Sequence, residues 1–400
     1  MKSKIKLFVF TVILLLSCHT KSFVTLNEFN NSEDIKEAEV YNLQHYTVTF
    51  AAVGDNLFHH TVYGRYLENG VYNLAPIFSE VKSIIENADL AFVNQETVMA
   101  GSSFGYSGFP RFNTPAALAQ VLADTGFDIV SLANNHAMDM RAEGLYATLD
   151  LLDTIEGLTV IGARRSGESA KIVTRNNISF GFLGYTFSTG WYPNPRDNPN
   201  LVSVINREVM TKEISELRPL CDFLIVSMHW GDEYRLQPGR DQIELAQFMA
   251  ELNVDVIIGH HPHVLQRVDI ITLPNGRQTL CYYSLGNFVS HQIERETLIG
   301  GMAVMTFSKE ELFLESGELT EQLTITEIGL LPLVTHYDHR WGNTKVFPLY
   351  AYTEELLRIH RHSSVDPLFT MNFLNSVPDR LNVRIVTENP FLGVGENSHY

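Results

Sequence analysis

The chain has 400 residues, 45% of them hydrophobic, and a formal net charge of −17 at pH 7. The length fits one large α/β domain with additions, and the apolar content suffices for a substantial core, which excludes an intrinsically disordered protein. A charge of this sign repels nucleic acid, so we expect no nucleic-acid partner, and a polyanionic substrate would need a local cation.

The N-terminal residues have the pattern of an export signal. Three lysines precede an apolar stretch over 7–16, which is short for a membrane-spanning helix. The segment 15–18, Leu-Leu-Ser-Cys, resembles the lipobox of lipoproteins. We therefore predict a signal peptide over 1–17 and an exported, cell-envelope lipoprotein anchored in the membrane at Cys18. An ordinary cleaved signal with an incidental cysteine is the alternative.

Residues 18–45 are polar and acidic without an apolar period, which predicts a tether before a domain over 46–335. An apolar run at 48–53 begins the domain, and further short apolar runs then alternate with helical patterns. Strands are predicted at 89–93, 128–132, 158–162, 178–184, 222–228 and 255–258, and helices at 76–87, 115–124, 142–155, 206–217 and 239–252. This alternation predicts an α/β fold with βαβ units and a largely buried sheet.

The pattern changes after residue 264. Pro274-Asn275-Gly276 is a hairpin signal, and strand-like stretches follow at 301–307 and 320–330, so an antiparallel portion should follow the parallel one. Residues 353–376 look helical and the last fifteen form a loose tail, within a C-terminal extension over 336–400. Cys221 and Cys281 adjoin apolar runs, which favours buried thiols; a disulfide between them is the alternative.

Polar residues able to bind metals follow five of the apolar runs. Open α/β sheets bind ligands at the carboxyl ends of their strands. Asp55 follows the first run, Glu96 the second, and Asn135 with His136 the third. Each of these segments alone could be a turn or a solvated loop, but the three together indicate a metal site more specifically than any one of them.

Histidines follow the other two runs. His229 ends one of them, and on its own it fits a buried structural histidine. His260, His261 and His263 lie within four residues directly after the other. Three such histidines are hard to explain structurally, because a buried, unpaired imidazole costs free energy. Imidazole suits Zn or Fe, and carboxylate and amide oxygens also suit Mn, so the identity of the metal stays open.

Taken in order, these segments resemble the CapA family of capsule and poly-γ-glutamate biosynthesis proteins, which is related to the calcineurin-like metallophosphoesterases. The resemblance covers about residues 48–290. It rests on Gly54-Asp55, Asn94-Gln95-Glu96-Thr97, Ala133-Asn134-Asn135-His136, His229-Trp230-Gly231-Asp232-Glu233-Tyr234, Gly259-His260-His261-Pro262-His263-Val264 and Tyr283-Ser284-Leu285-Gly286-Asn287-Phe288. It implies an αββα sandwich, here with a C-terminal antiparallel and helical addition.

The resemblance also implies roles for single residues. Asp55 and His263 would bind one metal ion, and Asn135, His229 and His261 a second. Glu96 takes the place of a bridging aspartate, His136 that of the acid that protonates the leaving group, and Asp139 would orient His136 or begin a helix.

Two positions depart from the related pattern. Leu57 stands where phosphoesterases commonly carry a histidine, so the first metal site would bind weakly or borrow His59 or His60. Arg141 stands where glycine is usual, and it would hold an anionic substrate or be a solvated surface residue. Asn287 is expected beside the site, in contact with substrate.

These features predict a hydrolase of phosphoesters or glutamyl amides with two divalent metal ions, Mn, Fe or Zn. Two such ions lower the pKa of a water molecule and polarise a phosphoryl or carbonyl oxygen. The alternative is a non-catalytic, metal-dependent binding or assembly factor for an anionic surface polymer. Capsule synthesis proteins are possible partners in either case.

Overall fold

Two β-sheets form the centre of the molecule. The structure, a computed structural model, describes residues 40–167, 170–314 and 319–392. The first sheet has the order β16 (Lys345–Pro348), β15 (Leu319–His336), β14 (Ile299–Leu314), β1 (Val40–Asn56), β4 (Leu90–Gln95), β5 (Ile129–Ser131) and β6 (Thr159–Ile161), with β13 (Asn287–Val289) also beside β1. The second has the order β11 (Val268–Thr272), β12 (Gln278–Tyr282), β10 (Val256–His260), β9 (Phe223–His229), β8 (Ile178–Thr186) and β7 (Lys171–Arg175).

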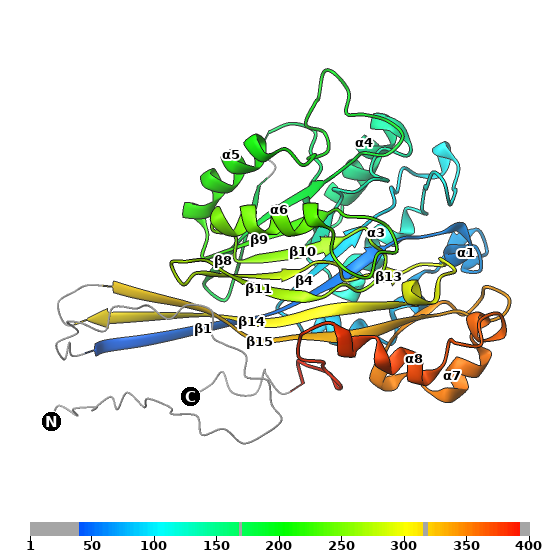
Figure 1. The fold of residues 1–400 in the computed structure, drawn as a ribbon. Coiled ribbons are helices and arrows are strands. Elements are labelled where there is room, and N and C mark those ends of the chain that lie inside the picture. Colours follow the sequence, from blue (N-terminus) through cyan, green and yellow to red (C-terminus); the bar gives the residue numbers. More distant parts are fainter. Residues whose placement is uncertain (1–39, 168–169, 315–318, 393–400) are drawn as a thin grey trace.

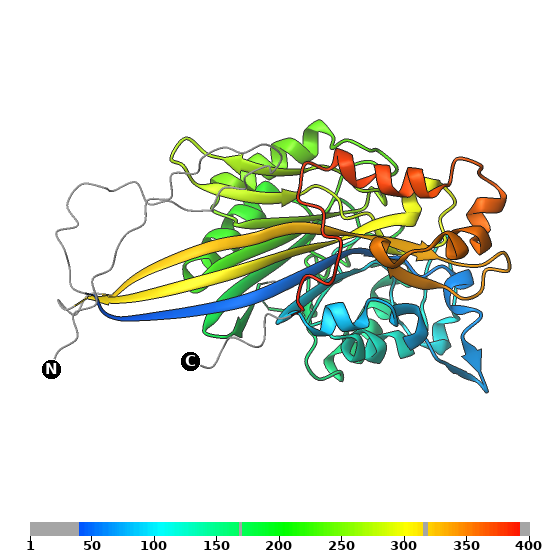
Figure 2. The ribbon, with the colours of Figure 1, turned by 90° about the horizontal axis from the view of Figure 1, so that it is seen from below.

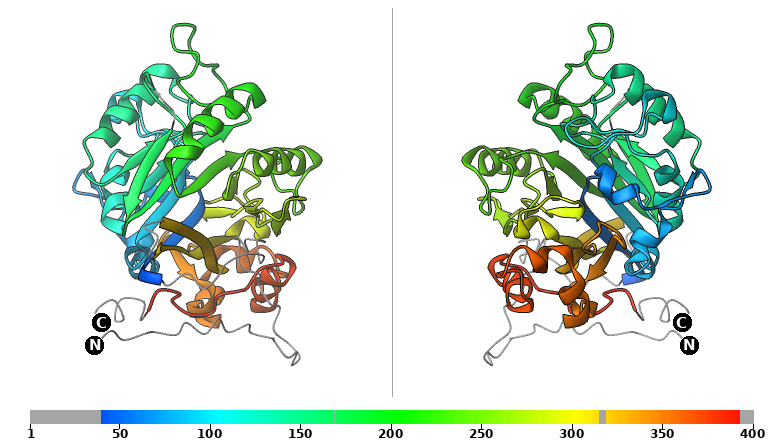
Figure 3. Two further views of the ribbon diagram at one scale, coloured as in Figure 1. Left: turned by 90° about the vertical axis from the view of Figure 1, so that its left-hand side faces the viewer. Right: turned by 90° about the vertical axis from the view of Figure 1, so that its right-hand side faces the viewer.

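Helices cover the outer faces of both sheets, as the end-on views of Figure 3 show. The helices α2 (Lys82–Glu86), α3 (Ala117–Thr125) and α4 (Arg141–Asp153) pack on the first sheet through Ile84, Leu118 and Leu145. The helices α5 (Arg207–Leu217) and α6 (Arg240–Glu251) pack on the second through Ile214 and Met249 (Figure 1).

The main core lies between the sheets. Phe50, Phe92, Phe182, Ile225 and Ile258 are all buried there. Each sheet contains four neighbouring parallel strands: β1, β4, β5 and β6 in the first, and β8, β9, β10 and β12 in the second. Their continuous apolar runs are typical of parallel strands covered on both faces. The predicted αββα sandwich is confirmed.

The C-terminal part adds antiparallel strands and short helices, as predicted. The strands β14, β15 and β16 run antiparallel. The helices α7 (Glu354–Ile359) and α8 (Met371–Ser376) pack against β15 through Leu357 and Leu374 (Figure 1). Two-residue strands and single-turn helices complete the described elements: α1 (His60–Tyr63), β2 (Leu67–Glu68), β3 (Val71–Tyr72), η1 (Ala75–Phe78), η2 (Ser102–Phe104), η3 (Arg218–Leu220), η4 (Arg295–Leu298), η5 (Leu349–Ala351), η6 (Arg361–Ser364) and η7 (Pro378–Arg380).

Several elements differ in length from their prediction. Strand β1 begins at Val40, inside the predicted tether, and pairs with β14 from Val40 to Val53. With β15 these strands form a ribbon that extends beyond the helices (Figure 2). The helix predicted over 76–87 is divided into η1 and α2, and the one over 353–376 into α7, η6 and α8. Strand β7 was not predicted; it is a half-exposed edge strand without a long apolar run.

Cys221 and Cys281 are free thiols, so the disulfide that we considered is absent. None of the helices in the described part of the chain combines the length and apolarity that crossing a membrane requires. The predicted signal peptide, the anchor at Cys18 and most of the tether lie outside the described residues.

Candidate metal centre

The predicted ligands meet where strands of both sheets end. Asp55 lies at the end of β1, Glu96 directly after β4, His229 at the end of β9, and His261 and His263 just after β10. All five are buried. Because parallel strands end at the same edge, residues more than 200 positions apart in the sequence become neighbours.

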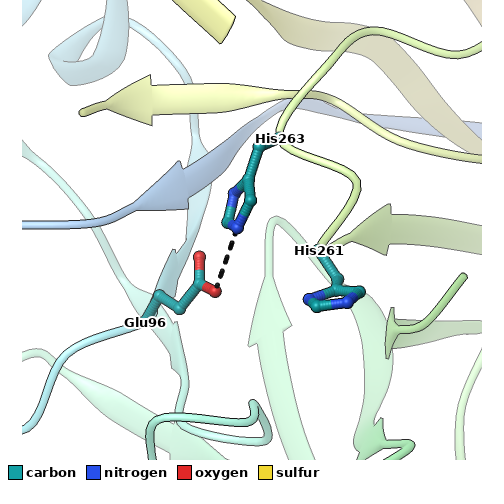
Figure 4. A group of neighbouring side chains, drawn as sticks. All are labelled: Glu96, His261 and His263. Atoms are coloured by element: carbon teal, nitrogen blue, oxygen red, sulfur yellow. Dashed lines mark ion pairs between the residues drawn. The ribbon is translucent and has the colours of Figure 1, made fainter. Parts of the chain in front are cut away.

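Three of these residues form a compact donor set. Glu96, His261 and His263 each offer an atom, and these atoms lie within 4.8 Å of one another (Figure 4). Neither carboxylate oxygen of Glu96 has a hydrogen-bond partner, and neither does Nδ1 of His261. Buried polar atoms without partners are costly, and carboxylate with imidazole is a donor set of divalent transition metals. The residues present therefore fit a metal ion.

Two oxygen atoms, one from Asp55 and one from Asn287, orient the imidazole ring of His263. Nδ1 of His263 lies 3.0 Å from Oδ2 of Asp55 and 3.0 Å from Oδ1 of Asn287. The amide nitrogen of Asn287 donates to Gln292 and to the carbonyl of Thr297, so its oxygen must face the imidazole. In the neutral imidazole, which is the form that binds a metal ion, Nδ1 therefore carries the hydrogen and the lone pair of Nε2 points towards Glu96, whose Oε1 lies 3.8 Å away.

Asp55 and Asn287 thus hold the imidazole of His263 in place, a pattern that commonly surrounds metal-binding histidines. The carboxylate of Asp55 also accepts hydrogen bonds from the Asn94 side chain at 2.8 Å and from the backbone of His261 at 3.1 Å. Direct coordination by Asp55, and direct contact of Asn287 with substrate, stay predictions.

His229 connects Asn135 to this set. Its Nε2 lies 2.9 Å from Oδ1 of Asn135 and 3.5 Å from Oε1 of Glu96. Its ring centroid lies 4.8 Å from that of His261. The structure therefore brings together the three residues that the resemblance implied for the second metal, namely Asn135, His229 and His261.

His136 and Asp139 form a pair at the rim. Nδ1 of His136 lies 2.8 Å from Oδ2 of Asp139, which also accepts a hydrogen bond from the backbone of Phe112 at 2.7 Å. The side chain of His136 is 12% exposed, whereas that of Asp139 is buried. The expected orienting contact is present, and it leaves Nε2 of His136 free to face a ligand.

Burial and neighbouring charges shift the pKa values of the buried set. Burial raises the pKa of Glu96 well above its usual range, and the neighbouring Asp55 adds to the effect. Burial opposes protonation of His263, but the carboxylates of Glu96 and Asp55 outweigh it and raise its pKa to about 9. Burial and the neighbouring His263 lower the pKa of His261 to about 3. The carboxylates thus favour positive charge beside them, which a metal ion also provides.

The backbone is strained or crowded at this site. His261 and His263 have φ values of 91° and 59°, a region that side chains other than glycine seldom adopt. A Cβ at Gly54 would lie 1.9 Å from the carbonyl oxygen of Gly286, and one at Gly259 would lie 2.0 Å from that of Tyr283. The segment 283–288, for which the sequence suggested no ligand, therefore packs its backbone directly against both ligand-bearing strands.

Leu57, which stands where phosphoesterases commonly carry a histidine, is buried and apolar. Nδ1 of His59 lies 3.3 Å from the carbonyl oxygen of Leu57 and accepts a weak hydrogen bond from the backbone of His291 at 3.4 Å. His60 is exposed. Neither histidine belongs to the compact donor set.

Three residues near the site had no role in the sequence analysis. Asn94 contacts Asp55 and lies 3.5 Å from His229. His260 is buried with both ring nitrogens lacking hydrogen-bond partners. Phe187 packs its ring on His261 at 4.6 Å. Asn94 and His260 lie within quoted motifs, so the motifs contained a signal, whereas nothing in the local sequence distinguishes Phe187.

Fold and site together define a class: an αββα protein with a carboxylate–histidine centre at its strand ends. Residues 49–292 match a family model described as bacterial capsule synthesis protein PGA_cap, which covers more than half of the chain. The chain belongs to this family, in agreement with the resemblance inferred from its motifs.

Two relatives are proteins of bacilli. The PGA biosynthesis protein CapA of Bacillus subtilis is 36% identical over 43% of this chain and 45% of its own length. The capsule biosynthesis protein CapA of Bacillus anthracis is 29% identical over 64% of this chain and 62% of its own. These matches span less than two thirds of either relative.

Solved structures give weaker matches. NAD nucleotidase of Haemophilus influenzae aligns over 84% of this chain and 68% of its own, with 14% identity and a TM-score of 0.40. A purple acid phosphatase from yellow lupin aligns over 70% of this chain and 54% of its own, with 11% identity and a TM-score of 0.36.

Proposed function

We propose that the chain is a metal-dependent hydrolase acting on phosphoester or glutamyl amide bonds in the synthesis or export of an anionic surface polymer such as capsule or poly-γ-glutamate. One observation carries the proposal. Glu96 is fully buried beside His261 and His263, and its carboxylate has no hydrogen-bond partner in the described structure. Burial raises the pKa of this carboxyl well above its usual range, and a bound divalent cation would stabilise its charged form.

In this hydrolase, separate residues would bind the metal ions, orient His263 and donate a proton to the leaving group. Glu96, His261 and His263 would hold a divalent ion, with Asn135 and His229 extending the set towards a second, and such ions polarise phosphoryl or carbonyl oxygens. Asp55 and Asn287 keep Nδ1 of His263 protonated, so its Nε2 lone pair stays available. Asp139 holds His136 so that Nε2 can donate a proton to the leaving group.

A second candidate function is metal-dependent binding of the polymer without hydrolysis. The observation that favours it is the position of Leu57, where a buried apolar side chain stands in place of a further donor. The compact set found among the described residues contains three side chains. A single ion would bind polymer carboxylates without completing a two-metal centre.

The full-length chain, purified in detergent without a histidine tag, tests both candidates. We would measure metal content by mass spectrometry and hydrolysis of p-nitrophenyl phosphoesters and γ-glutamyl anilides. Bound metal with hydrolysis lost in His261→Ala but kept in the exposed control His60→Ala supports the hydrolase. One ion without turnover supports the binding factor, and no metal after reconstitution contradicts both.

The proposed location is the cell envelope, with a lipid on Cys18 and residues 18–45 leading towards the domain. The support is the sequence of the first eighteen residues. Labelling of cells with a palmitate analogue should mark the wild-type chain and not Cys18→Ser. Equal labelling of both would contradict lipidation at this cysteine.

A further inference from the structure

We infer that Arg111 and Arg141, held together by Tyr192, form a binding site for successive carboxylates of the anionic polymer, beside the metal centre. This inference rests on the proposed substrate class and names residues that would recognise it. The guanidinium carbon of Arg141 lies 4.3 Å from the centre of the Tyr192 ring. Nη1 of Arg111 donates a hydrogen bond to the Tyr192 hydroxyl at 3.2 Å. One tyrosine therefore contacts two cations that lie 30 positions apart.

Neither guanidinium is neutralised within the described structure. No carboxylate there lies within 4.0 Å of Arg111 or Arg141, although this chain is acidic and eleven of its described ion pairs involve an arginine. Glu143, in the first turn of α4, makes no ion pair with Arg141. Two adjacent cations repel each other, so their pairing favours an anionic ligand, and guanidinium binds carboxylate with two parallel hydrogen bonds.

The backbone at Arg141 supports a functional role. Its φ is 59°, in the left-handed region that glycine adopts without strain. Arginine at this position keeps the fold under local strain, and such strain concentrates at binding sites. The side chain gains no ion pair in exchange within the described residues; its recorded contact is the tyrosine ring.

A backbone hydrogen bond connects the segment that carries Arg111 to the His136–Asp139 pair. The backbone of Phe112, next to Arg111, donates to Asp139, which orients His136. The ring of Phe112 lies 4.7 Å from that of His136. Arg111 is thus next in the chain to a residue that contacts His136, the predicted proton donor, and Arg141 follows Asp139 by two positions.

The loop that carries Tyr192 is anchored in the same place. A Cβ at Gly190 would lie 2.0 Å from the carbonyl oxygen of Asn135, so this loop packs directly on a predicted ligand. The indole of Trp191 donates to the carbonyl of Pro110 at 3.2 Å. Trp191 and Phe109 are 62% and 75% exposed. A γ-linked glutamate unit has one carboxylate and two methylene groups, so cations beside exposed aromatic rings match both of its parts.

Binding of a γ-linked glutamate polymer of about 20 units to the full-length chain, measured by calorimetry at low salt, tests this. Exposed charge-assisted contacts predict about a 5-fold loss of affinity for Arg111→Ala or Arg141→Gly and more than about 20-fold for the double variant. Arg207→Ala is the matched control: it begins α5 as Arg141 begins α4, stacks on Phe248 at 4.8 Å and should bind like wild type.

Two further measurements, of the unfolding temperature and of the metal content, separate an effect on polymer binding from effects on folding and on metal binding. Arg141→Gly should unfold at the same or a higher temperature than wild type, because glycine relieves the positive φ, while its affinity falls. Metal content should not change in any of these variants. A lower unfolding temperature with unchanged affinity would mean that Arg141 is structural.

The outcomes distinguish this inference from the proposed function. Wild-type affinity in the double variant, or an equal loss in Arg207→Ala, overturns the inference and leaves the proposed polymer untouched. If wild type binds inorganic phosphate or neutral dextran as well as it binds the glutamate polymer, carboxylate recognition is overturned. Absence of polymer binding by wild type overturns the proposed substrate class and this inference with it.

Discussion

Two buried groups of histidines differ in how their ring nitrogens are used. The strand-end cluster comprises Glu96, His229, His260, His261 and His263, and the C-terminal histidine cluster comprises His291, His336 and His360. In the second, His291 bonds to the hydroxyls of Thr61 and Thr344, both at 2.9 Å. His360 bonds to the carbonyl of Thr335 at 3.1 Å and to the backbone N–H of His362 at 2.9 Å.

In the strand-end cluster, by contrast, His260 has no hydrogen-bond partner, and Glu96 and His261 leave atoms without one. Burial is the same in both groups, so burial does not separate a structural histidine from a ligand. Hydrogen bonding does, because a folded protein seldom leaves buried polar atoms unpaired unless they serve a bound group. The C-terminal histidine cluster stabilises the fold, and the strand-end cluster is available for chemistry.

The largest expected effect is at Glu96. Glu96→Gln should lower bound metal and reduce hydrolysis by at least about 100-fold, because several kcal/mol of charge stabilisation is lost. In chelator-treated protein the same change should raise the unfolding temperature, because a buried unpaired carboxylate is removed. Metal analysis, kinetics and calorimetry measure these. A metal-free variant that is less stable than metal-free wild type would mean that Glu96 stabilises the fold, as the C-terminal histidine cluster does.

His360→Ala should have the opposite pattern of effects: the unfolding free energy falls and the metal content does not change. It leaves the Thr335 carbonyl and the His362 N–H without partners and opens a cavity, which should lower the unfolding free energy by about 3 kcal/mol. Metal content of the folded protein should stay at the wild-type value. Denaturant titration and elemental analysis measure both, and loss of metal would mean that the two clusters are coupled.

The C-terminal histidine cluster should also make stability depend on pH. Burial lowers the pKa of His336 to about 4 and that of His360 to about 3. Above the usual histidine pKa of about 6.5 both are neutral in either state; as pH falls from there to about 4, the unfolded chain gains protons that the folded one does not. Stability should therefore fall in this window, by on the order of 3 kcal/mol for His336. His336→Phe should flatten that fall in denaturant titrations, and an unchanged slope would exclude His336 as its source.

Asp139→Asn should have a smaller effect on activity than Glu96→Gln. The amide keeps the shape but loses the charge that holds His136, so we expect roughly a 10-fold slower reaction, with metal content unchanged. Steady-state kinetics and elemental analysis measure both. A rate equal to that of wild type would place the proton donor elsewhere.

The elements recovered from sequence alone are those with strong local signals. Runs such as 222–228 and 255–258 became β9 and β10, and Asp55, Glu96, His229, His261 and His263 were all placed at strand ends. Motif order also predicted the family. The ends of β1 and the edge strand β7 were not recovered, because polar strand residues facing solvent look like linker sequence.

The sequence by itself determined which residues are chemically able to bind a metal and that they follow strands, because both depend on residue type and hydrophobic pattern. Only the tertiary structure decided which of them are left without hydrogen-bond partners. It also decided that Asn287 orients His263, that Tyr192 joins Arg111 to Arg141, and that His291 and His360 are structural. The physical reason is that each of these contacts joins residues brought together by sheet register and loop packing, which a linear pattern does not record.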